Sequence, residues 1–413
     1  MAHEGLAHCI VYRRLSQALA EWLHLPYLRP SYPTMYRKAK QPIVRSLLSI
    51  GFIYLLASNI ALAQLDNRPF EERYSAPTKR FGIGAHSFSY FRNLEWFNPV
   101  ADGKTLFGQQ LSLRGIYKVD SNLSLSAGAF AGLSFGNKGL ERIAPLFTLR
   151  YQKRNFRLLF GSLEGNLSHR LYEPLQDFES VINQRLEYGT QFQWWHKKLW
   201  ADVWIDWQAE ARRFQPKQER ISGGASSTYT LAEGSNYQIE AKGQARVLHI
   251  GGQLDTAANK PPLITTYATA LGLRGSYSPA ENLSLFADIA YMHRGTSTRD
   301  STFAAGTKSG NGIYANAGAI LAKRFTLMAS YWNGSSFYFP NGGAIYSSIS
   351  SSVNFDGQLN SRNREIVILR AIANIKLADQ ATLTINVEPI YDLIRRKGDY
   401  GYSFYLNVFI PQF

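Results

Sequence analysis

Cysteine is nearly absent from the chain: its 413 residues contain one, Cys9. A disulfide framework and a zinc site built on paired cysteines are therefore excluded. Beyond residue 63 there is also no apolar run of about 20 residues, the length that a membrane-spanning helix requires. Lys and Arg outnumber Asp and Glu by 45 to 30, but they are scattered singly along the chain. Because nucleic-acid binding favours a clustered basic stripe, nucleic acid is not an expected partner.

The amino terminus has the pattern of a secretory signal peptide over residues 35–63. Met35 is followed by a basic region, an apolar core from Ser46 to Ala57, and the A-x-A site Ala61–Ala63. Cleavage there would leave Gln64 first. Residues 1–34 precede the better start at Met35 and are interpreted as a mis-assigned extension of the gene. Residues 64–80 are predicted to be a short periplasmic leader, and the remaining residues, 81–413, a single domain.

From Phe81 onward, segments alternate between apolar and polar residues. Between residues 123 and 135, odd positions are Leu, Ala or Phe, while most even positions are Ser or Gly. Such period-2 alternation predicts β-strands with one apolar face. The stretch from Gly401 to Phe413 is the clearest case, since it ends the chain on an apolar strand. An open edge of that kind invites aggregation, whereas a closed barrel in lipid has no edge.

Short and long connections alternate along the chain, as they do in outer-membrane barrels. The expected tight turns are 120–122, 153–155, 196–198, 233–236, 278–282, 322–324 and 378–380. The expected long loops are 92–104, 137–143, 164–186, 209–218, 251–262, 293–311, 333–363 and 390–399. These connections predict an all-β fold, a transmembrane antiparallel up-and-down barrel of about 16 strands, with 14 or 18 as alternatives. Both chain ends would then lie on the periplasmic side.

Charged residues on the polar parity of these strands would line the lumen, because a Lys or Arg facing lipid at the midplane costs about 2–4 kcal/mol. The cations are Arg114, Lys118, Arg150, Arg157, Lys242, Arg246, Arg274, Arg370 and Lys376. The opposing acids are Asp202, Asp206, Glu240, Asp288 and Glu388. Since cations outnumber acids, the lumen is expected to favour anionic solutes, although many of these charges could instead pair across strands.

The third long loop lies within residues 161–189 and is the most distinctive stretch. Its apolar residues would not be left in water, which predicts that the loop packs onto the inside wall or, alternatively, onto neighbouring loops. Residues 177–184 are expected to form a short helix. The candidate residues for a constriction are Glu164, His169, Arg170, Glu173, Asp177 and Glu179.

This arrangement resembles the general diffusion porins, 16-stranded barrels whose third external loop folds inward. The resemblance implies that acidic loop groups face a basic wall, here Arg114, Arg150 and Arg157, and set size and charge selectivity. The resemblance covers architecture and loop order. It does not extend to a shared motif, because the Pro-Glu-Phe-Gly-Gly sequence of enterobacterial porins is missing. The stretch GNLSHRLYEPLQDFE also resembles uncharacterised outer-membrane proteins of Bacteroidetes-type bacteria.

The sequence therefore predicts an outer-membrane channel for passive or weakly selective passage of small polar solutes, anionic ones among them, without a cofactor or a metal. The alternatives are a plugged barrel that acts through its external loops as an adhesin, receptor or assembly partner, and an outer-membrane hydrolase. The Ser–His pairs Ser168–His169 and Ser297–His293 lack a nucleophile-elbow setting, and no H-E-x-x-H motif occurs, so an enzyme is not expected. Expected partners are outer-membrane lipid and, through Phe413, the barrel-assembly machinery; a monomer and a homotrimer are not distinguished.

Overall fold

The computed structural model describes residues 70, 80–137, 139–212, 218–252, 263–298, 308–350 and 363–410. The expected extension, the signal peptide, Cys9 and Phe413 lie outside these residues, as does most of the expected leader. Within the described part of the chain, no helix has the length and apolar character needed to cross a membrane.

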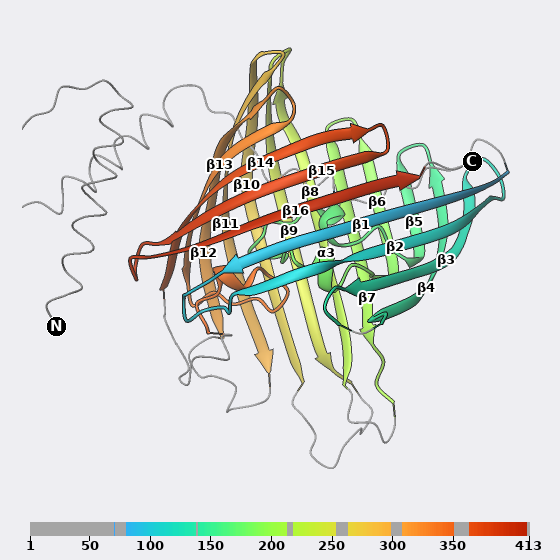
Figure 1. Ribbon diagram of the computed structural model, residues 1–413, viewed down its shortest axis with the longest axis horizontal. Helices are drawn as coiled ribbons and strands as arrows, with labels where there is room; N and C mark the ends of the chain where they lie inside the picture. The colour runs from blue at the N-terminus through green and yellow to red at the C-terminus, as the bar shows by residue number, and fades with distance from the viewer. Residues whose placement is uncertain are drawn as a thin grey trace, which may run out of the picture. The chain divides into compact units, whose positions relative to one another are not determined.

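Sixteen antiparallel strands close into one barrel, as Figure 1 shows. The first eight are β1 (Phe81–Glu95), β2 (Lys104–Lys118), β3 (Leu123–Ser134), β4 (Arg142–Lys153), β5 (Phe156–Ser162), β6 (Tyr188–His196), β7 (Leu199–Ala209) and β8 (Glu219–Glu233). The second eight are β9 (Tyr237–Gly251), β10 (Ile264–Ala280), β11 (Leu283–Thr298), β12 (Ser309–Leu321), β13 (Phe325–Ser335), β14 (Asn363–Ala378), β15 (Ala381–Asp392) and β16 (Lys397–Ile410). Each strand pairs with its neighbours in sequence, so the predicted fold class and strand number are confirmed.

The barrel closes through its first and last strands, which run side by side in Figure 1 as the blue and the dark red arrow. Their register extends from Ala85 opposite Ile410 to Glu95 opposite Tyr400. Closure leaves no free sheet edge, and it gives every strand two hydrogen-bonded neighbours.

All seven predicted tight turns join consecutive strands at one end of the barrel, which we call the turn end. In the first of them, Asp120 Oδ1 accepts hydrogen bonds from the backbone N–H groups of Asn122 and Leu123. At the opposite end, the loop end, one prediction was wrong: the connection expected at 390–399 is a short reversal between Asp392 and Lys397. Asp392 Oδ1 accepts hydrogen bonds from the backbone N–H groups of Ile394 and Arg395. This side-chain cap ends β15 and turns the chain back within a few residues.

The two faces of the sheet differ as the alternation predicts. On β10, Leu271 and Leu273 point outward and are 72% and 54% exposed. On neighbouring β9, Lys242 and Arg246 point inward and are buried. An apolar exterior around a closed barrel with a polar interior requires hydrocarbon outside, so the protein is an outer-membrane β-barrel and the predicted location is confirmed.

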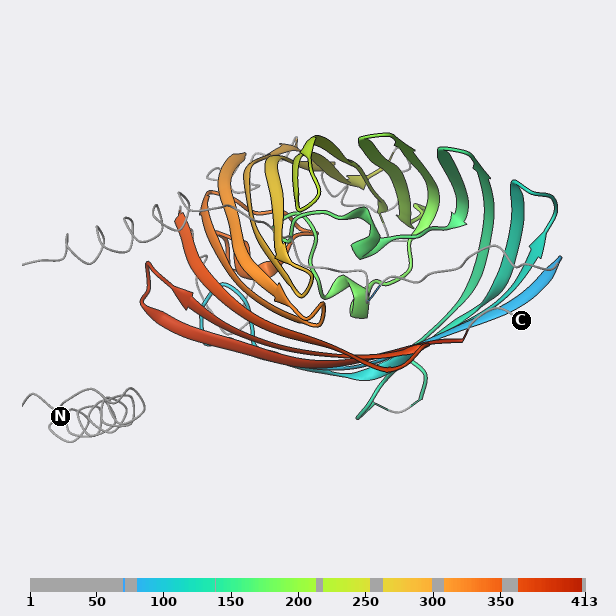
Figure 2. The same ribbon diagram turned by 90° about the horizontal axis from the view of Figure 1, so that it is seen from above.

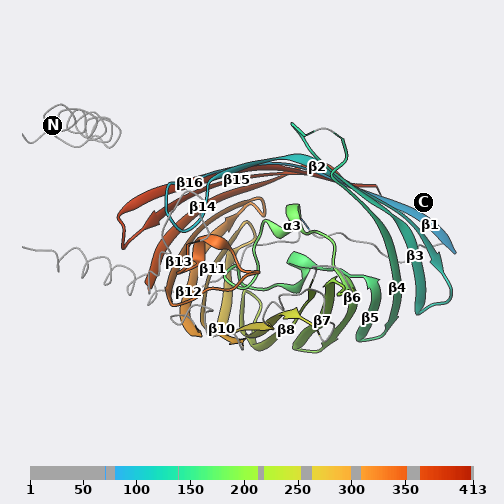
Figure 3. The same ribbon diagram turned by 90° about the horizontal axis from the view of Figure 1, so that it is seen from below.

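Two loops from the loop end fold into the lumen, as the views along the barrel show (Figure 2, Figure 3). The third loop spans residues 163–187 and contains the 3₁₀ turn η2 (Asn166–His169) and the single helical turn α3 (Ser180–Asn183). The seventh loop begins at residue 336 and contains η3 (Ala344–Tyr346). α3 is shorter than the helix expected over residues 177–184.

Side chains of both loops and of the wall share one buried apolar cluster. From the third loop it includes Leu171, Tyr172 and Leu175, and from the seventh Phe337, Phe339, Ile345 and Tyr346. A second cluster contains Phe70, whose ring meets those of Phe88, Phe178 and Tyr405 edge-on at centroid distances of 5.1–6.3 Å. Phe70 therefore lies among side chains of the barrel interior.

Candidate functional site

The third loop is held to the wall by hydrogen bonds from several strands. Tyr172 donates through its hydroxyl to Asp288 Oδ1 at 2.7 Å and through its backbone N–H to Gln244 Oε1 at 2.9 Å. Arg246 Nη1 donates to the carbonyl of Leu175 at 3.0 Å. The wall side chains thus satisfy backbone groups that the inward-folded loop removes from water.

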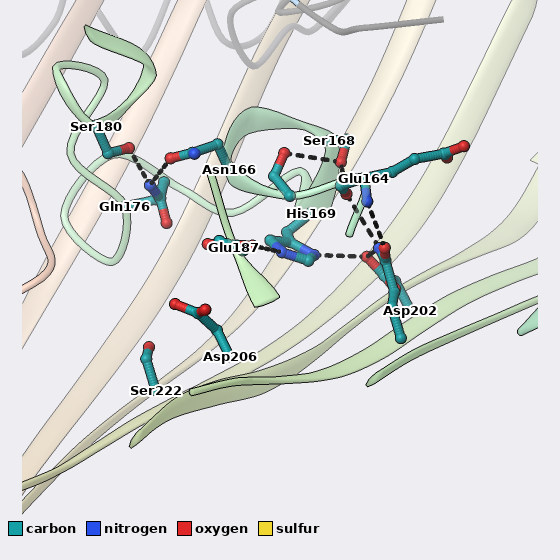
Figure 4. Close-up of polar contacts among 12 residues, drawn as sticks. Glu164, Asn166, Ser168, His169, Gln176, Ser180, Glu187, Asp202, Asp206 and Ser222 are labelled. Carbon is teal, nitrogen blue, oxygen red and sulfur yellow. Dashed lines mark hydrogen bonds and ion pairs between the residues drawn. The ribbon is translucent and has the colours of Figure 1, made fainter. Parts of the chain in front are cut away.

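His169 of the third loop has no exposed surface. Figure 4 shows its ring between the side chains of Glu187 and Asp202. Its Nδ1 lies 2.7 Å from Asp202 Oδ2 and its Nε2 lies 2.7 Å from Glu187 Oε2. The ring stacks on Trp204 with centroids 3.6 Å apart. Burial alone would lower the pKa of His169, but the carboxylates of Glu187 and Asp202 outweigh it and raise that pKa to about 9. His169 is therefore an imidazolium clamped between two acids, and neither nitrogen is available as a general base.

Glu173 connects the third loop to the seventh. Its Oε2 accepts hydrogen bonds from the hydroxyls of Tyr314 and Tyr346 and pairs with Arg370 Nη2 at 2.7 Å. Arg370 Nε also pairs with Glu388 at 2.7 Å. The predicted wall cation Arg370 and the predicted loop acid Glu173 thus meet in one buried network.

Asp177 and Glu179 lie beside the same network, because Arg92 pairs with Glu388 at 3.0 Å and also approaches Glu179. Glu179 is 3.8 Å from Arg92 Nε and also contacts Lys104 Nζ. Asp177 Oδ1 accepts the backbone N–H of Glu179 at 3.1 Å, and its own N–H donates to the carbonyl of Asn341 in the seventh loop. Burial, reinforced by the nearby Glu179 carboxylate, raises the pKa of Asp177 to about 7.

A cavity of about 760 Å³ lies between the third loop and the wall formed by β2 to β5. It reaches the turn end, because the turn residues 120–122 and Arg154 line it. Of the described residues, six cations and two acids line it: Arg114, Lys118, Arg150, Arg154, Arg157, Arg185, Asp120 and Glu164. Ser, Thr, Asn and Gln side chains and several apolar ones, Ile116 and Leu163 among them, complete the lining. Its surplus of cations suits an anionic molecule.

Glu164 lies between two of these cations. Arg157 Nη2 is 2.7 Å from Glu164 Oε2, Arg157 Nη1 is 3.1 Å from Oε1, and Arg150 also bonds to Oε1. Arg114, on the same wall, donates to Thr148 Oγ1 at 3.2 Å. Five residues predicted for the lumen or its constriction therefore line one cavity: Arg114, Lys118, Arg150, Arg157 and Glu164.

The remaining predicted residues lie away from this cavity. Arg170 places its guanidinium 4.1 Å from the ring centroid of Trp200, and Arg274 lies 3.7 Å from Glu240. Lys242 pairs with Asp288 at 3.3 Å, which leaves both side chains buried beneath the third loop. Together with Arg246, Lys242 supports the packed loop.

Several residues of the site were not predicted. Glu187 and Arg185 were absent from the candidates, although Glu187 holds His169 and Arg185 Nη2 donates to the carbonyl of Phe70 at 3.0 Å. The inward fold of the seventh loop was missed too. Its aromatic residues Phe337 and Phe339 carried the same signal that identified the third loop, namely apolar side chains that water would not hold.

Catalytic and metal candidates are few. Among the described residues, no group of three His, Cys, Asp or Glu side chains is placed to hold a metal ion. Ser168 neighbours the clamped His169 and donates to the carbonyls of Glu164 and Gly165. Ser297 is four positions from His293 on β11, about 13 Å along the strand, so these two side chains do not meet.

Comparison with known proteins gives low sequence identity to solved outer-membrane barrels. OmpT of Vibrio cholerae, in its outer-membrane expressed form, aligns with 8% identity over 82% of this chain and 100% of its own, at a TM-score of 0.47. OprD of Pseudomonas aeruginosa aligns with 11% identity over 86% and 98%, also at 0.47. OccAB4 of Acinetobacter baumannii aligns with 11% identity over 81% and 99%, at 0.44.

No curated protein matches the chain. A family model does match, and it covers every strand of the barrel. The matching model is that of the lipid A 3'-O-deacylase type, over residues 72–413, and the chain belongs to this family.

Proposed function

We propose that this outer-membrane barrel is a channel for small polar, anionic solutes, which it selects in the cavity beneath the third loop. The observation that carries the proposal is the lining of that cavity, where six cations face two acids inside a closed barrel. The surplus of cations gives the cavity a positive electrostatic potential, which low-dielectric walls focus, so that anions are concentrated there. The third loop, packed between the cavity and the loop end, narrows the route.

Planar-bilayer recordings test this function. Purified protein should give small, resolvable conductance steps, and its reversal potential in a KCl gradient should show a preference for chloride. The double variant Arg150→Gln/Arg157→Gln removes two of the lining cations and should reduce this preference. Absence of any steps from correctly folded protein would favour the plugged barrel that acts through its external loops.

A liposome-swelling series would then identify the solutes. Succinate should enter faster than glucose, and glucose faster than lysine, because the cavity lining carries a surplus of positive charge. An order governed by size alone would contradict charge selection in the cavity.

Family membership and one surface cluster support a second candidate, hydrolysis of an acyl ester of lipid A. His293 lies on the outward face near the loop end, with Nδ1 2.8 Å from Asn311 Oδ1, to which the Tyr291 hydroxyl also donates at 2.8 Å. This arrangement assigns the proton to Nδ1 and leaves Nε2 to act as a base at the lipid interface. Mass spectrometry of lipid A incubated with wild-type protein and with His293→Ala would test it; an unchanged acyl pattern with both would reject it.

The proposed partners follow from the barrel. Outer-membrane lipid contacts the apolar exterior, and we propose that the barrel-assembly machinery reads the terminal Phe413. A monomer and a homotrimer are the two alternatives for its assembly, and light scattering of the protein in detergent would distinguish them.

A further inference from the structure

One partly exposed ion-pair cluster in the barrel lines the cavity beneath the third loop. Arg150, Arg157 and Glu164 keep 14%, 21% and 20% of their side-chain surface exposed, and all three line the cavity. In contrast, Lys242 and Asp288 keep 4% and 0%. A solute in the cavity can therefore reach the first cluster without unpacking the third loop.

The Glu164 carboxylate is bound as a small oxyanion would be. It takes two bonds from the guanidinium of Arg157 and one from that of Arg150, from two neighbouring strands. Planar guanidinium groups suit bidentate bonds to carboxylate and phosphate, so the same pair fits either group on a free molecule.

The position of this carboxylate is set by its own backbone. Gln191 of β6 accepts the backbone N–H of Glu164 at 3.0 Å and donates to its carbonyl at 3.2 Å. These bonds fix the main chain at Glu164, so the carboxylate can move only by rotation about its side-chain bonds. Glu164 can thus leave the two arginines without any change in the third loop.

We propose that Arg150 and Arg157 form an oxyanion subsite for the carboxylate or phosphate group of a solute, and that Glu164 occupies this subsite as a tethered competitor. A free oxyanion binds when the Glu164 side chain turns into the cavity. The apparent dissociation constant is the intrinsic one divided by the fraction of molecules in which the subsite is vacant. The competitor thereby keeps binding weak enough for the solute to leave, as conduction requires.

This inference deepens the proposed function and rests on it for the route of the solute, but its test does not need conduction. Equilibrium dialysis of the refolded full chain in detergent micelles, with radiolabelled inorganic phosphate and with citrate, measures the affinity directly. If the subsite is vacant in about 1–10% of molecules, Glu164→Gln should tighten binding about 10- to 100-fold. Adding Arg157→Gln to that variant should abolish the gain.

The matched control is Glu240→Gln, which removes the same charge from the lumen wall outside this cavity, next to Arg274. It should leave both affinities unchanged. Equal gains for Glu164→Gln and Glu240→Gln would show that net charge alone matters and would overturn the subsite, as would an unchanged affinity in Glu164→Gln. Glu164→Asp, which keeps the charge on a shorter stem, should fall between wild type and Glu164→Gln, and this ordering gives a second readout should the Gln variant fold poorly.

Bilayer recordings separate the two proposals. Tighter oxyanion binding in a Glu164→Gln variant that never conducts would leave the subsite standing and reject the channel. Anion-selective conduction with no change of affinity would leave the channel standing and reject the subsite.

Discussion

His169 of the third loop and Asp202 of β7 are joined by a 2.7 Å contact between Nδ1 and Oδ2, and neither side chain has exposed surface. Because Glu187 approaches the other ring nitrogen, one imidazolium neutralises part of the charge of two buried acids. This clamp fixes η2 against the wall. The inward fold of the third loop is therefore stabilised electrostatically as well as by apolar packing.

Removing the imidazolium should destabilise the barrel. In His169→Ala, the carboxylates of Asp202 and Glu187 would lose the charge that they share, and breaking a buried pair in this way costs about 3–5 kcal/mol. Guanidinium unfolding of the refolded protein in micelles would measure the loss. The triple variant His169→Ala/Glu187→Gln/Asp202→Asn should recover part of it, because no buried charge is then left unpaired. Equal stability of wild type and His169→Ala would contradict a stabilising clamp.

The contribution of His169 should depend on pH. Its pKa is raised from 6.5 to about 9, so the stabilisation is complete below about pH 6.5 and is lost as pH rises through 9. The shift corresponds to about 3 kcal/mol. We expect the stability difference between wild type and His169→Gln to shrink over this range. Burial raises the pKa of Glu187, but the His169 imidazolium outweighs it and lowers that pKa below 4.5, so a second loss should follow only in acid.

Asp177 provides an independent check on this titration. Its pKa is raised from 3.8 to about 7, so its contribution is fully present below 3.8 and declines as pH rises toward 7. Asp177→Asn should remove that decline and leave the difference between wild type and His169→Gln unchanged. If the stability difference between wild type and His169→Gln vanished in the Asp177→Asn background, the pH dependence would belong to Asp177 and not to His169.

The strands were predictable because lipid outside and polar groups inside impose the same period-2 rule along every span. A one-residue slip on β9 would turn Lys242 and Arg246 toward hydrocarbon, which fixes the register from sequence alone. The reversal after Asp392 was not predictable in this way. It depends on a side chain that bonds to backbone two and three positions ahead, a local effect that alternation does not record.

The candidate site was predictable to a smaller extent. Parity and neighbouring strands place Arg150 and Arg157 on one wall, and the start of the third loop places Glu164 above them. The clamp on His169 could not be derived, because Asp202 and Glu187 approach it only once β6 and β7 have paired within the barrel. Phe70 was beyond reach for the same reason, since its aromatic neighbours come from β1, β16 and the third loop.

Glu173 should couple the two inward loops. It accepts from Tyr314 and Tyr346 and pairs with Arg370, so Glu173→Gln weakens contacts of both loops at once. Hydrogen exchange should then speed up together in the third and seventh loops. Glu281→Gln is the control, because its ion pair with Lys323 joins two exposed turns. Faster exchange in one loop alone would show that the loops are not coupled through Glu173.

Shortening the third loop should widen the channel. Deletion of residues 166–183 removes both η2 and α3 from the lumen, and single-channel conductance should rise several-fold while the tight turns and strands remain. Circular dichroism would establish that the barrel has folded. An unchanged conductance in folded protein would show that this loop does not restrict passage.

The outward face of β10 should tolerate a charge only near the membrane boundary. Leu271 lies at the middle of its strand and is 72% exposed, so Leu271→Arg places a cation in hydrocarbon and should cost about 2–4 kcal/mol in lipid vesicles. Leu377, which is 58% exposed, precedes the turn between β14 and β15, and Leu377→Arg should cost only about 0–1 kcal/mol because the guanidinium reaches the interface. Unfolding by guanidinium in vesicles compares the two. Similar costs at both positions would mean that the midplane of the bilayer does not cross β10 at Leu271.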